Sequence, residues 1–228
     1  MTHTALIVGA SRTLGLALAT EYLRLGWDVI GTVRGTERTK LHELADSSEG
    51  RLVVESLDIT DPDQLSALRD RLTDRMLDLL FVNAGVTRGN LPIADVPTEM
   101  FTEVLITNAL SPLRVIEALR SLVTPDGTIG VMSSRQGSVA MNTNGGQDAY
   151  RASKSALNQL MRCYAARYAD DAHTLLLMNP GWVQTDLGGP GAVLTIDESI
   201  PGVAATINAQ QGKPGLQFLD YQGETVPW

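Results

Sequence analysis

Short apolar runs alternate with amphipathic segments along the whole chain. The first run, residues 4–8, ends at a glycine and has the continuous apolar character of a buried parallel strand. In the next segment Leu14, Leu18 and Tyr22 recur at helical spacing, and Gly26 ends the pattern. The same alternation predicts further strands at residues 28–33, 51–55, 77–82, 127–133, 173–178 and 215–219, and further helices at 39–45, 62–73, 98–122 and 147–168.

Strict alternation of strand and helix favours a parallel sheet covered on both faces. We therefore expect an α/β fold, a single-domain Rossmann-type doubly wound sheet of about seven strands, to occupy residues 1–228. The stretch DLGGPGAVLTIDESIPG is rich in glycine and proline. It predicts a mobile substrate lid at about residues 186–205.

Composition and charge exclude several classes of protein. The 228 residues carry a net charge of -8, which argues against a nucleic-acid-binding protein. The apolar run near the N-terminus is too short for a signal peptide or a membrane span, so no membrane association is expected. A single cysteine, Cys163, fits a reducing compartment, and we expect a cytoplasmic protein. The three histidines are scattered, and no metal site is expected.

The strongest chemical signal is the pair Tyr150 and Lys154. Their four-residue spacing places both side chains on one face of a helix. A free phenol has a pKa of about 10, and a nearby ammonium is expected to lower it toward neutrality. Such a pair is also common on ordinary helix surfaces, so its meaning depends on the remaining motifs.

The loops at the strand ends indicate a dinucleotide. The turn from Gly9 to Gly15 joins the first strand to a helix, where backbone N–H groups can face a pyrophosphate. The second strand ends in Thr32-Val33-Arg34 without the acidic residue that would bind ribose hydroxyls. Arg34 and Arg12 offer planar donors suited to a 2′-phosphate, which favours NADP(H), although two exposed surface arginines would give the same pattern.

Four motifs carry a resemblance to a known family. They are Gly9-Ala-Ser-Arg-Thr-Leu-Gly15, Asn83-Ala-Gly85, Tyr150-x-x-x-Lys154 and Asn179-Pro-Gly-Trp-Val-Gln-Thr185. In type, order and approximate spacing, over residues 4 to about 186, they resemble the motifs of the short-chain dehydrogenase/reductase (SDR) family. The segment after Thr185 and the terminal Pro227-Trp228 resemble the C-factor/sniffer-type carbonyl reductase branch.

This resemblance implies roles for individual residues. The implied catalytic set is Asn108, Ser134, Tyr150 and Lys154, with Asn108 holding a water that relays protons to Lys154. The implied cofactor-binding residues are Gly9, Ser11, Arg12, Thr13, Leu14, Gly15, Arg34, Asp58, Ile59, Asn83, Ala84, Gly85, Tyr150, Lys154, Pro180, Gly181, Val183 and Thr185. The chain departs from the family at Thr13, where the loop usually has its middle glycine.

Ser133 and Ser134 are both candidates for the catalytic serine. Side chains alternate along a strand, so only one of them should face the cleft, and we predict Ser134 at the strand end. The loop between Ser134 and Tyr150 is longer than in much of the family, and it is expected to help shape the substrate pocket.

The leading hypothesis is an NADPH-dependent reductase of a ketone or aldehyde that works as a homodimer or homotetramer. Val86, Met141, Trp182 and Leu187 are candidates for an apolar substrate pocket. A dinucleotide-binding signalling or sensor protein with vestigial catalysis is the alternative, motivated by Thr13. An epimerase or dehydratase of the same superfamily ranks last.

Overall fold

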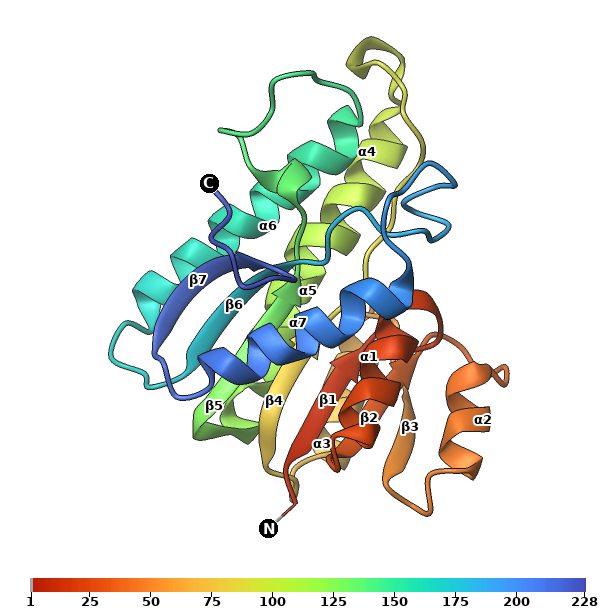
Figure 1. Cartoon of the computed structure of the whole chain (residues 1–228), viewed down its shortest axis with the longest axis vertical. Coiled ribbons are helices and arrows are strands. Elements are labelled where there is room, and N and C mark those ends of the chain that lie inside the picture. Colours follow the sequence, from red (N-terminus) through yellow and green to blue (C-terminus); the bar gives the residue numbers. More distant parts are fainter. Residues whose placement is uncertain (1) are drawn as a thin grey trace.

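A seven-stranded parallel sheet forms the centre of the computed structural model, which describes residues 2–228 (Figure 1). The strand order is β3-β2-β1-β4-β5-β6-β7. Successive strands are added on one side of β1 up to β3 and on its other side from β4 onward, so the topological switch point lies between β1 and β4. Open α/β sheets bind their ligands at this point. The strands are β1 (Thr4–Val8), β2 (Asp28–Val33), β3 (Leu52–Ser56), β4 (Leu77–Val82), β5 (Val123–Met132), β6 (Thr174–Asn179) and β7 (Gly215–Asp220). The predicted Rossmann-type sheet is confirmed.

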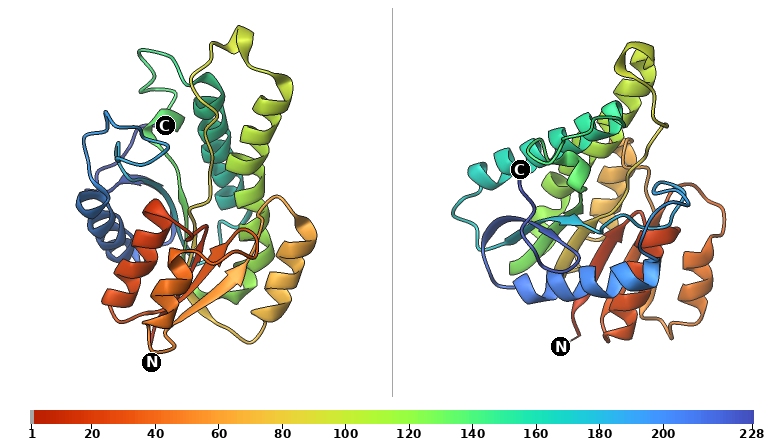
Figure 2. Two further views of the ribbon diagram at one scale, coloured as in Figure 1. Left: turned by 90° about the vertical axis from the view of Figure 1, so that its right-hand side faces the viewer. Right: turned by 45° about the horizontal axis from the view of Figure 1, so that its top comes forward.

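Helices cover both faces of the sheet (Figures 1 and 2). On β1, Leu6 and Val8 belong to the core under α3, α5 and α6, whereas Ala5 and Ile7 belong to the core under α1, α2 and α7. This alternation is the reason that β1 reads as a continuous apolar run. The helices are α1 (Thr13–Arg24), α2 (Lys40–Asp46), α3 (Pro62–Arg71), α4 (Thr98–Leu105), α5 (Ser111–Leu119), α6 (Asp148–Arg167) and α7 (Ile196–Gln210).

Helix α7 occupies the second half of the predicted lid. A lid is predicted at about residues 186–205, and residues 196–205 of that stretch form the first part of α7, a helix that the hydrophobic pattern did not predict. Thr195 and Glu198 form a capping box at its start, and Ile200 and Val203 are buried against the sheet. Pro201 lies inside the helix and gave this stretch the composition of a loop. The part without helix is restricted to residues 186–195.

The predicted helix at 98–122 is divided into several pieces. Between α4 and α5 the chain makes one π-helical turn, η2 (Ile106–Leu110), and after α5 a 3₁₀ turn, η3 (Arg120–Leu122), leads into β5. A π turn widens the helix locally and is frequent at functional sites. Here it contains Asn108, which is fully buried. Strand β5 begins four residues before its predicted start and ends at Met132, so Ser133 lies just beyond it.

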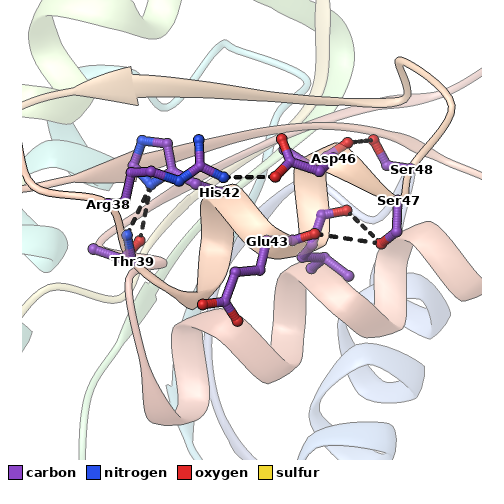
Figure 3. Close-up of polar contacts among 9 residues, drawn as sticks. Arg38, Thr39, His42, Glu43, Asp46, Ser47 and Ser48 are labelled. Atoms are coloured by element: carbon purple, nitrogen blue, oxygen red, sulfur yellow. Dashed lines mark hydrogen bonds and ion pairs between the residues drawn. The ribbon is translucent and has the colours of Figure 1, made fainter.

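A compact set of polar contacts within residues 38–48 orders α2 and the residues at its two ends (Figure 3). Thr39 and His42 form a capping box in which His42 Nδ1 accepts the Thr39 N–H at 3.1 Å. Arg38 pairs with Asp46 at the other end of the helix, at 2.5 Å. Arg38 is four residues after Arg34, where the sequence predicts the 2′-phosphate, so these contacts order the second half of the connection between β2 and α2.

Candidate active site

Tyr150 and Lys154 lie together in the first turns of α6. Both side chains are buried, and the Lys154 ammonium is 5.9 Å from the centre of the Tyr150 ring. Lys154 Nζ donates to the carbonyl oxygen of Met132, the last residue of β5, at 2.8 Å. The 3₁₀ turn η4 (Arg135–Gly137) packs directly on this part of α6, because a side chain at Gly137 would meet the Lys154 backbone at 2.9 Å. The carboxyl end of β5 and helix α6 therefore hold the ammonium in one place.

Burial shifts both ionisable groups. Burial raises the pKa of Tyr150 to about 12, and a hydrogen bond with Ser134 offsets part of that rise. Burial lowers the pKa of Lys154 to about 8. The sequence predicts that Lys154 lowers the pKa of Tyr150, whereas in the structure this pKa is raised. Removal from water disfavours the phenolate, and the hydrogen bond with Ser134 offsets only part of that effect, so Tyr150 is a protonated phenol at neutral pH.

The two adjacent serines have different environments. The Ser134 side chain hydrogen-bonds with Tyr150 and also accepts the Gln136 N–H at 3.1 Å. Ser133 is buried, and its hydroxyl donates to Asn158 Oδ1 on α6 at 2.6 Å. Ser134 is thus the serine placed beside Tyr150, and Ser133 joins the sheet end to α6.

Asn108 connects the π turn to the helix that carries Tyr150. Its Oδ1 accepts the Val86 N–H at 2.7 Å, and its Nδ2 donates to the Val86 carbonyl at 2.8 Å. The same Nδ2 donates to Ser153 Oγ at 3.0 Å, and Ser153 Oγ donates to the Tyr150 carbonyl at 2.7 Å. A side chain added at Gly85 would lie 3.3 Å from Asn108 and 3.5 Å from Lys154 Nζ. Gly85 therefore leaves space directly over the lysine.

The glycine loop is fastened to the end of β4. Asn83 Nδ2 donates to the Gly9 carbonyl at 2.9 Å, and the Gly9 N–H donates to Thr32 Oγ1 at 2.9 Å. A side chain at Gly9 would collide with Ala84 at 2.9 Å, and one at Gly15 would collide with Asn83 at 2.6 Å. Only glycine fits these two close approaches of backbone. Ser11 and Leu14 lie half-buried in the same turn.

Thr13 is the strained member of this loop. It begins α1 with a φ of +47°, in the left-handed region that favours glycine. A β-branched residue is a genuine outlier there, at a cost of about 1–3 kcal/mol. The departure from the family pattern thus has a structural counterpart, because the residue that replaces the usual glycine keeps a glycine-type backbone.

Replacing Thr13 by glycine is therefore expected to stabilise the protein. Release of the left-handed strain outweighs the entropy that glycine loses on folding, for a net gain of about 1 kcal/mol in the free energy of unfolding. Chemical denaturation of the two proteins measures this difference. Thr13→Ala is the matched control, because alanine removes the hydroxyl but keeps the Cβ that causes the strain. A Thr13→Gly protein no more stable than Thr13→Ala would contradict the strain.

The adenosine end of the predicted site carries two exposed arginines. Arg34 follows β2, and Arg12 precedes α1, where it forms an ion pair with Asp186. Asp58 Oδ1 accepts the N–H and the hydroxyl of Thr60, at 2.9 and 2.7 Å. Ile59 is buried beside it. The Asp58 carboxylate therefore stabilises the turn that it begins.

A surface groove of about 230 Å³ lies close to this end, between α3 and α5. It shares Ile59 with the predicted cofactor residues, but its other lining side chains, which include Arg69 and Arg114, belong to none of the predicted sites. The groove therefore does not define the active site, whose position follows from the hydrogen-bonded residues described above.

The segment after β6 forms a loop that is held by hydrogen bonds among its own residues and to α7. Pro180 is buried, and its carbonyl accepts the Ser199 hydroxyl of α7 at 2.6 Å. Val183 is also buried and forms an isolated bridge with Leu194. Thr185 Oγ1 donates to the Val183 carbonyl at 3.3 Å and accepts the Gly188 N–H at 3.0 Å. The loop thus has its own internal hydrogen bonds.

Gly181 lies at the close approach of this loop to the end of the sheet. Its φ is +84°, and a side chain there would meet the Tyr221 ring at 3.2 Å. Trp182, the next residue, is exposed, but its indole N–H donates to the Gly188 carbonyl at 2.8 Å. The glycine therefore sets the path of the loop, and the tryptophan packs across it.

Comparison with known proteins identifies this arrangement. The sequence model of the family described as "short chain dehydrogenase" matches residues 3–191. The chain belongs to the short-chain dehydrogenase family. It is 38% identical to the C-signal protein of Myxococcus xanthus over 154 residues, which cover 67% of this chain and 93% of that protein.

Two solved structures are similar to this short-chain dehydrogenase over their whole length. A Burkholderia multivorans protein crystallised with bound NADP has a TM-score of 0.98 and 53% identity, with 100% of each chain covered. A carbonyl reductase from Pseudomonas aeruginosa PAO1 in complex with NADP has a TM-score of 0.93 and 34% identity, again with 100% of each chain covered. The resemblance to the C-factor and sniffer-type branch is thereby confirmed. The chain is an oxidoreductase of this family, acting on CH–OH or C=O groups.

The structure of this short-chain dehydrogenase also involves residues that sequence reasoning missed. Ser153 links Asn108 to the backbone of Tyr150, and Asp186 pairs with Arg12. Ser153 stands three residues after Tyr150, so the helical repeat alone could have placed it on the same side of α6. Asp186 gave no local signal, because its partner is 174 residues away in the chain.

Within residues 2–228, no helix has the length and apolar character needed to cross a membrane. In the same range, no three side chains of the His, Cys, Asp or Glu type gather as ligands for a metal ion.

Proposed function

We propose that this short-chain dehydrogenase reduces a ketone or an aldehyde to an alcohol with NADPH. The observation that carries the proposal is the contact of the Ser134 and Tyr150 hydroxyl groups beside the buried Lys154. A protonated phenol and a serine hydroxyl are two donors that can hold one carbonyl oxygen while negative charge develops on it. The same oxygen then receives the proton of Tyr150.

The residues around the glycine loop fit a dinucleotide. Backbone at Gly9 and Gly15 approaches so closely that no side chain is tolerated, as a pyrophosphate site at a helix N-terminus requires. An ammonium has three N–H donors, and within residues 2–228 Lys154 uses one on Met132, which leaves donors for ribose hydroxyls. When bound, the nicotinamide supplies the hydride. Val183, Thr185 and Pro180 would then border it.

Lys154 and Asn108 would help to replace the proton that Tyr150 loses. The lysine lies next to the phenol ring, and its lowered pKa lets it release a proton near neutral pH. Asn108 fixes the backbone at Val86 and, through Ser153, the first turn of α6. We propose that the Asn108 side of Lys154 is the route by which the site is reprotonated.

The substrate side favours an uncharged compound. Trp182, Leu187 and Val193 of the 182–195 loop are large apolar side chains exposed to solvent, at 54%, 45% and 72%. Exposed apolar side chains on one loop offer a surface that an apolar ligand can cover. We propose a small or medium apolar ketone or aldehyde as substrate, with residues 186–195 acting as the lid.

Replacing Arg34 by alanine tests the choice of cofactor. The change is expected to weaken NADPH binding by about tenfold or more, because a charge-assisted hydrogen bond to the 2′-phosphate is lost. NADH, which has no such phosphate, should bind as before. Fluorescence titration with the two cofactors measures both constants. Arg38→Ala is the matched control, because Arg38 is an exposed arginine of the same connection that pairs with Asp46. Equal losses for both cofactors would contradict the assignment.

The signalling protein of the alternative hypothesis has two observations in its favour. One is the strained Thr13 in the cofactor loop, and the other is the 38% identity to a protein named C-signal. A sensor would bind NADPH without turning over any carbonyl compound. A thermal shift with NADPH, combined with no NADPH consumption across a carbonyl panel, would favour this alternative over the reductase.

We also propose that the chain works in the cytoplasm as a homodimer or homotetramer. Helices α4 and α6 lie side by side on one face of the molecule, which offers a long helical surface for a second copy (Figures 1 and 2). Light scattering of the purified protein tests this assembly, and a monomer at micromolar concentration would overturn it.

A further inference from the structure

The residues after β7 return across the end of the sheet to α6. A turn at residues 220–224 reverses the chain, and Thr225 forms an antiparallel bridge with Leu219. The Val226 N–H donates to the Phe218 carbonyl at 2.8 Å, and Val226 is 3% exposed in the core under α6. This segment, residues 221–228, is therefore a fixed part of the fold.

Trp228 joins this segment to three other elements. Its backbone carbonyl accepts the Ala140 N–H at 3.0 Å. Its indole ring lies under the guanidinium of Arg162 on α6, 4.4 Å from the ring centre, and 5.7 Å from the ring of Phe218 on β7. A cation over an indole face is the most favourable arrangement of this kind. Figure 2 shows this end of the chain beside the loop that precedes α6.

The loop that Trp228 contacts lies between Ser134 and Tyr150 in the chain. Residues 138–147 run from η4, which follows Ser134, to the start of α6, which carries Tyr150. The two ends of the loop are held by the protein around them. At the first end the Gly137 carbonyl accepts Ser155 Oγ at 3.0 Å and Asn158 Nδ2 at 3.1 Å, and at the other end the Gln147 N–H donates to Asn90 Oδ1 at 2.6 Å. In the middle, residues 138–143 bond to each other in consecutive turns, whereas Asn144 and Gly145 accept hydrogen bonds from Arg151 of α6.

We propose that Trp228 is a positioning residue for the substrate side of the active site. The indole, held between Arg162 and Phe218, fixes the carbonyl that receives the Ala140 N–H. That hydrogen bond pins the middle of the 138–147 loop. The loop carries the exposed apolar side chain of Val139, directly before Ala140. Pinning it sets the wall against which an apolar substrate lies, while the catalytic groups remain held by β5 and α6. The substrate part of this inference rests on the proposed reductase function.

The Trp228→Ala variant tests whether Trp228 positions the 138–147 loop for substrate binding or acts on the catalytic groups. Hydrogen exchange followed by mass spectrometry should show faster exchange in residues 138–147, with the rest of the chain unchanged. The KM for the carbonyl compound that the wild type reduces fastest should rise by about tenfold, because displacement of a positioning element remote from the chemistry acts on binding geometry. The kcat and the dissociation constant of NADPH should change much less.

Two variants control for a general loss of structure. Trp228→Phe keeps an aromatic ring under Arg162 and should recover most of the wild-type KM and exchange. Met76→Ala removes another large exposed apolar side chain, far along the chain from the loop, and should leave both unchanged. If Trp228→Ala does not fold, Arg162→Gln removes one side of the indole clamp from an exposed position and should give the same changes in smaller degree.

Unchanged exchange in residues 138–147 would overturn the proposal. A kcat that falls with an unchanged KM would also overturn it, because it would place the effect on the catalytic groups. A failure of the proposed reductase function would show as a wild type without activity. The exchange experiment does not need turnover, so it would still decide whether Trp228 holds the loop in place.

Discussion

Replacing Tyr150 by phenylalanine is expected to lower turnover by about 10³-fold or more, within the range that general acid catalysis supplies. The hydroxyl is the only atom removed, and the ring keeps its place on α6. Tyr150 is 8% exposed, and burial raises its pKa to about 12, so the lost group is a phenol that carries its proton at neutral pH. NADPH affinity should change little. Steady-state kinetics and a fluorescence titration measure the two quantities.

Tyr168→Phe is the control for this result. It makes the same chemical change at the residue that follows α6, where the Tyr168 hydroxyl donates to Glu117 at 2.8 Å. Its turnover should stay near that of the wild type. Turnover that survives in Tyr150→Phe, or that falls equally in both variants, would remove Tyr150 from the role of proton donor.

Replacing Lys154 by methionine is expected to separate activity from stability. Turnover should fall by about 10²-fold or more, because the group that relays the proton is gone, and NADPH should bind more weakly because donors to its ribose are lost. The free energy of unfolding at pH 7 should be no lower than in the wild type. A methionine of similar length replaces a buried charge, and such replacements are often neutral or stabilising.

The pH dependence of stability provides an independent check on Lys154. Its folded pKa of about 8 lies below the value of 10.5 for an unperturbed lysine, so unfolding takes up a proton between these values. The free energy of unfolding therefore gains from Lys154 as pH rises from 8 toward 10.5, by at most ~1.4 kcal/mol per pH unit, and this gain is lost as pH falls through 8.

Denaturation curves of wild type and Lys154→Met between pH 7 and pH 10 isolate this effect. The stability difference between the two proteins should shift in favour of the wild type as pH rises. Tyr150 contributes in the opposite direction only above pH 10, where its unfolded form begins to ionise. Parallel curves for the two proteins would show that Lys154 keeps an ordinary pKa in the folded state.

The parts of the fold that depend on local pattern could be predicted from the sequence. Buried parallel strands read as unbroken apolar runs, and loops at their carboxyl ends carry the polar residues, so the sheet and the placement of Tyr150 beside Lys154 followed from spacing. The choice of Ser134 over Ser133 followed from alternation at a strand end. The structure places Ser134 on Tyr150 and Ser133 on Asn158.

The features that depend on tertiary contacts could not be predicted from the sequence. The direction of the Tyr150 pKa shift depends on how completely the phenol is removed from water, and spacing does not contain that information. The left-handed backbone at Thr13 is imposed by the β1–α1 turn against the preference of the residue itself. The contact of Trp228 with Ala140 joins positions 88 residues apart in the chain.

Helix α7 was missed for a different reason. Its signals were present in the sequence, since Thr195 and Glu198 have the capping-box spacing and Ile200, Val203 and Ile207 follow at helical intervals. Pro201 and the glycines that precede the helix outweighed them in the interpretation. A proline in the second turn is tolerated here because the helix packs its apolar side against the sheet and α1.

The most direct test of the account follows the hydride. The purified protein would be incubated with a panel of apolar ketones and aldehydes and with NADPH that carries deuterium at the transferable position of its nicotinamide. The account predicts an alcohol with one deuterium on the carbinol carbon, formed in equal amount to the NADPH consumed, and no such product from Tyr150→Phe. NADPH that binds tightly but transfers no deuterium to any carbonyl would contradict the reductase.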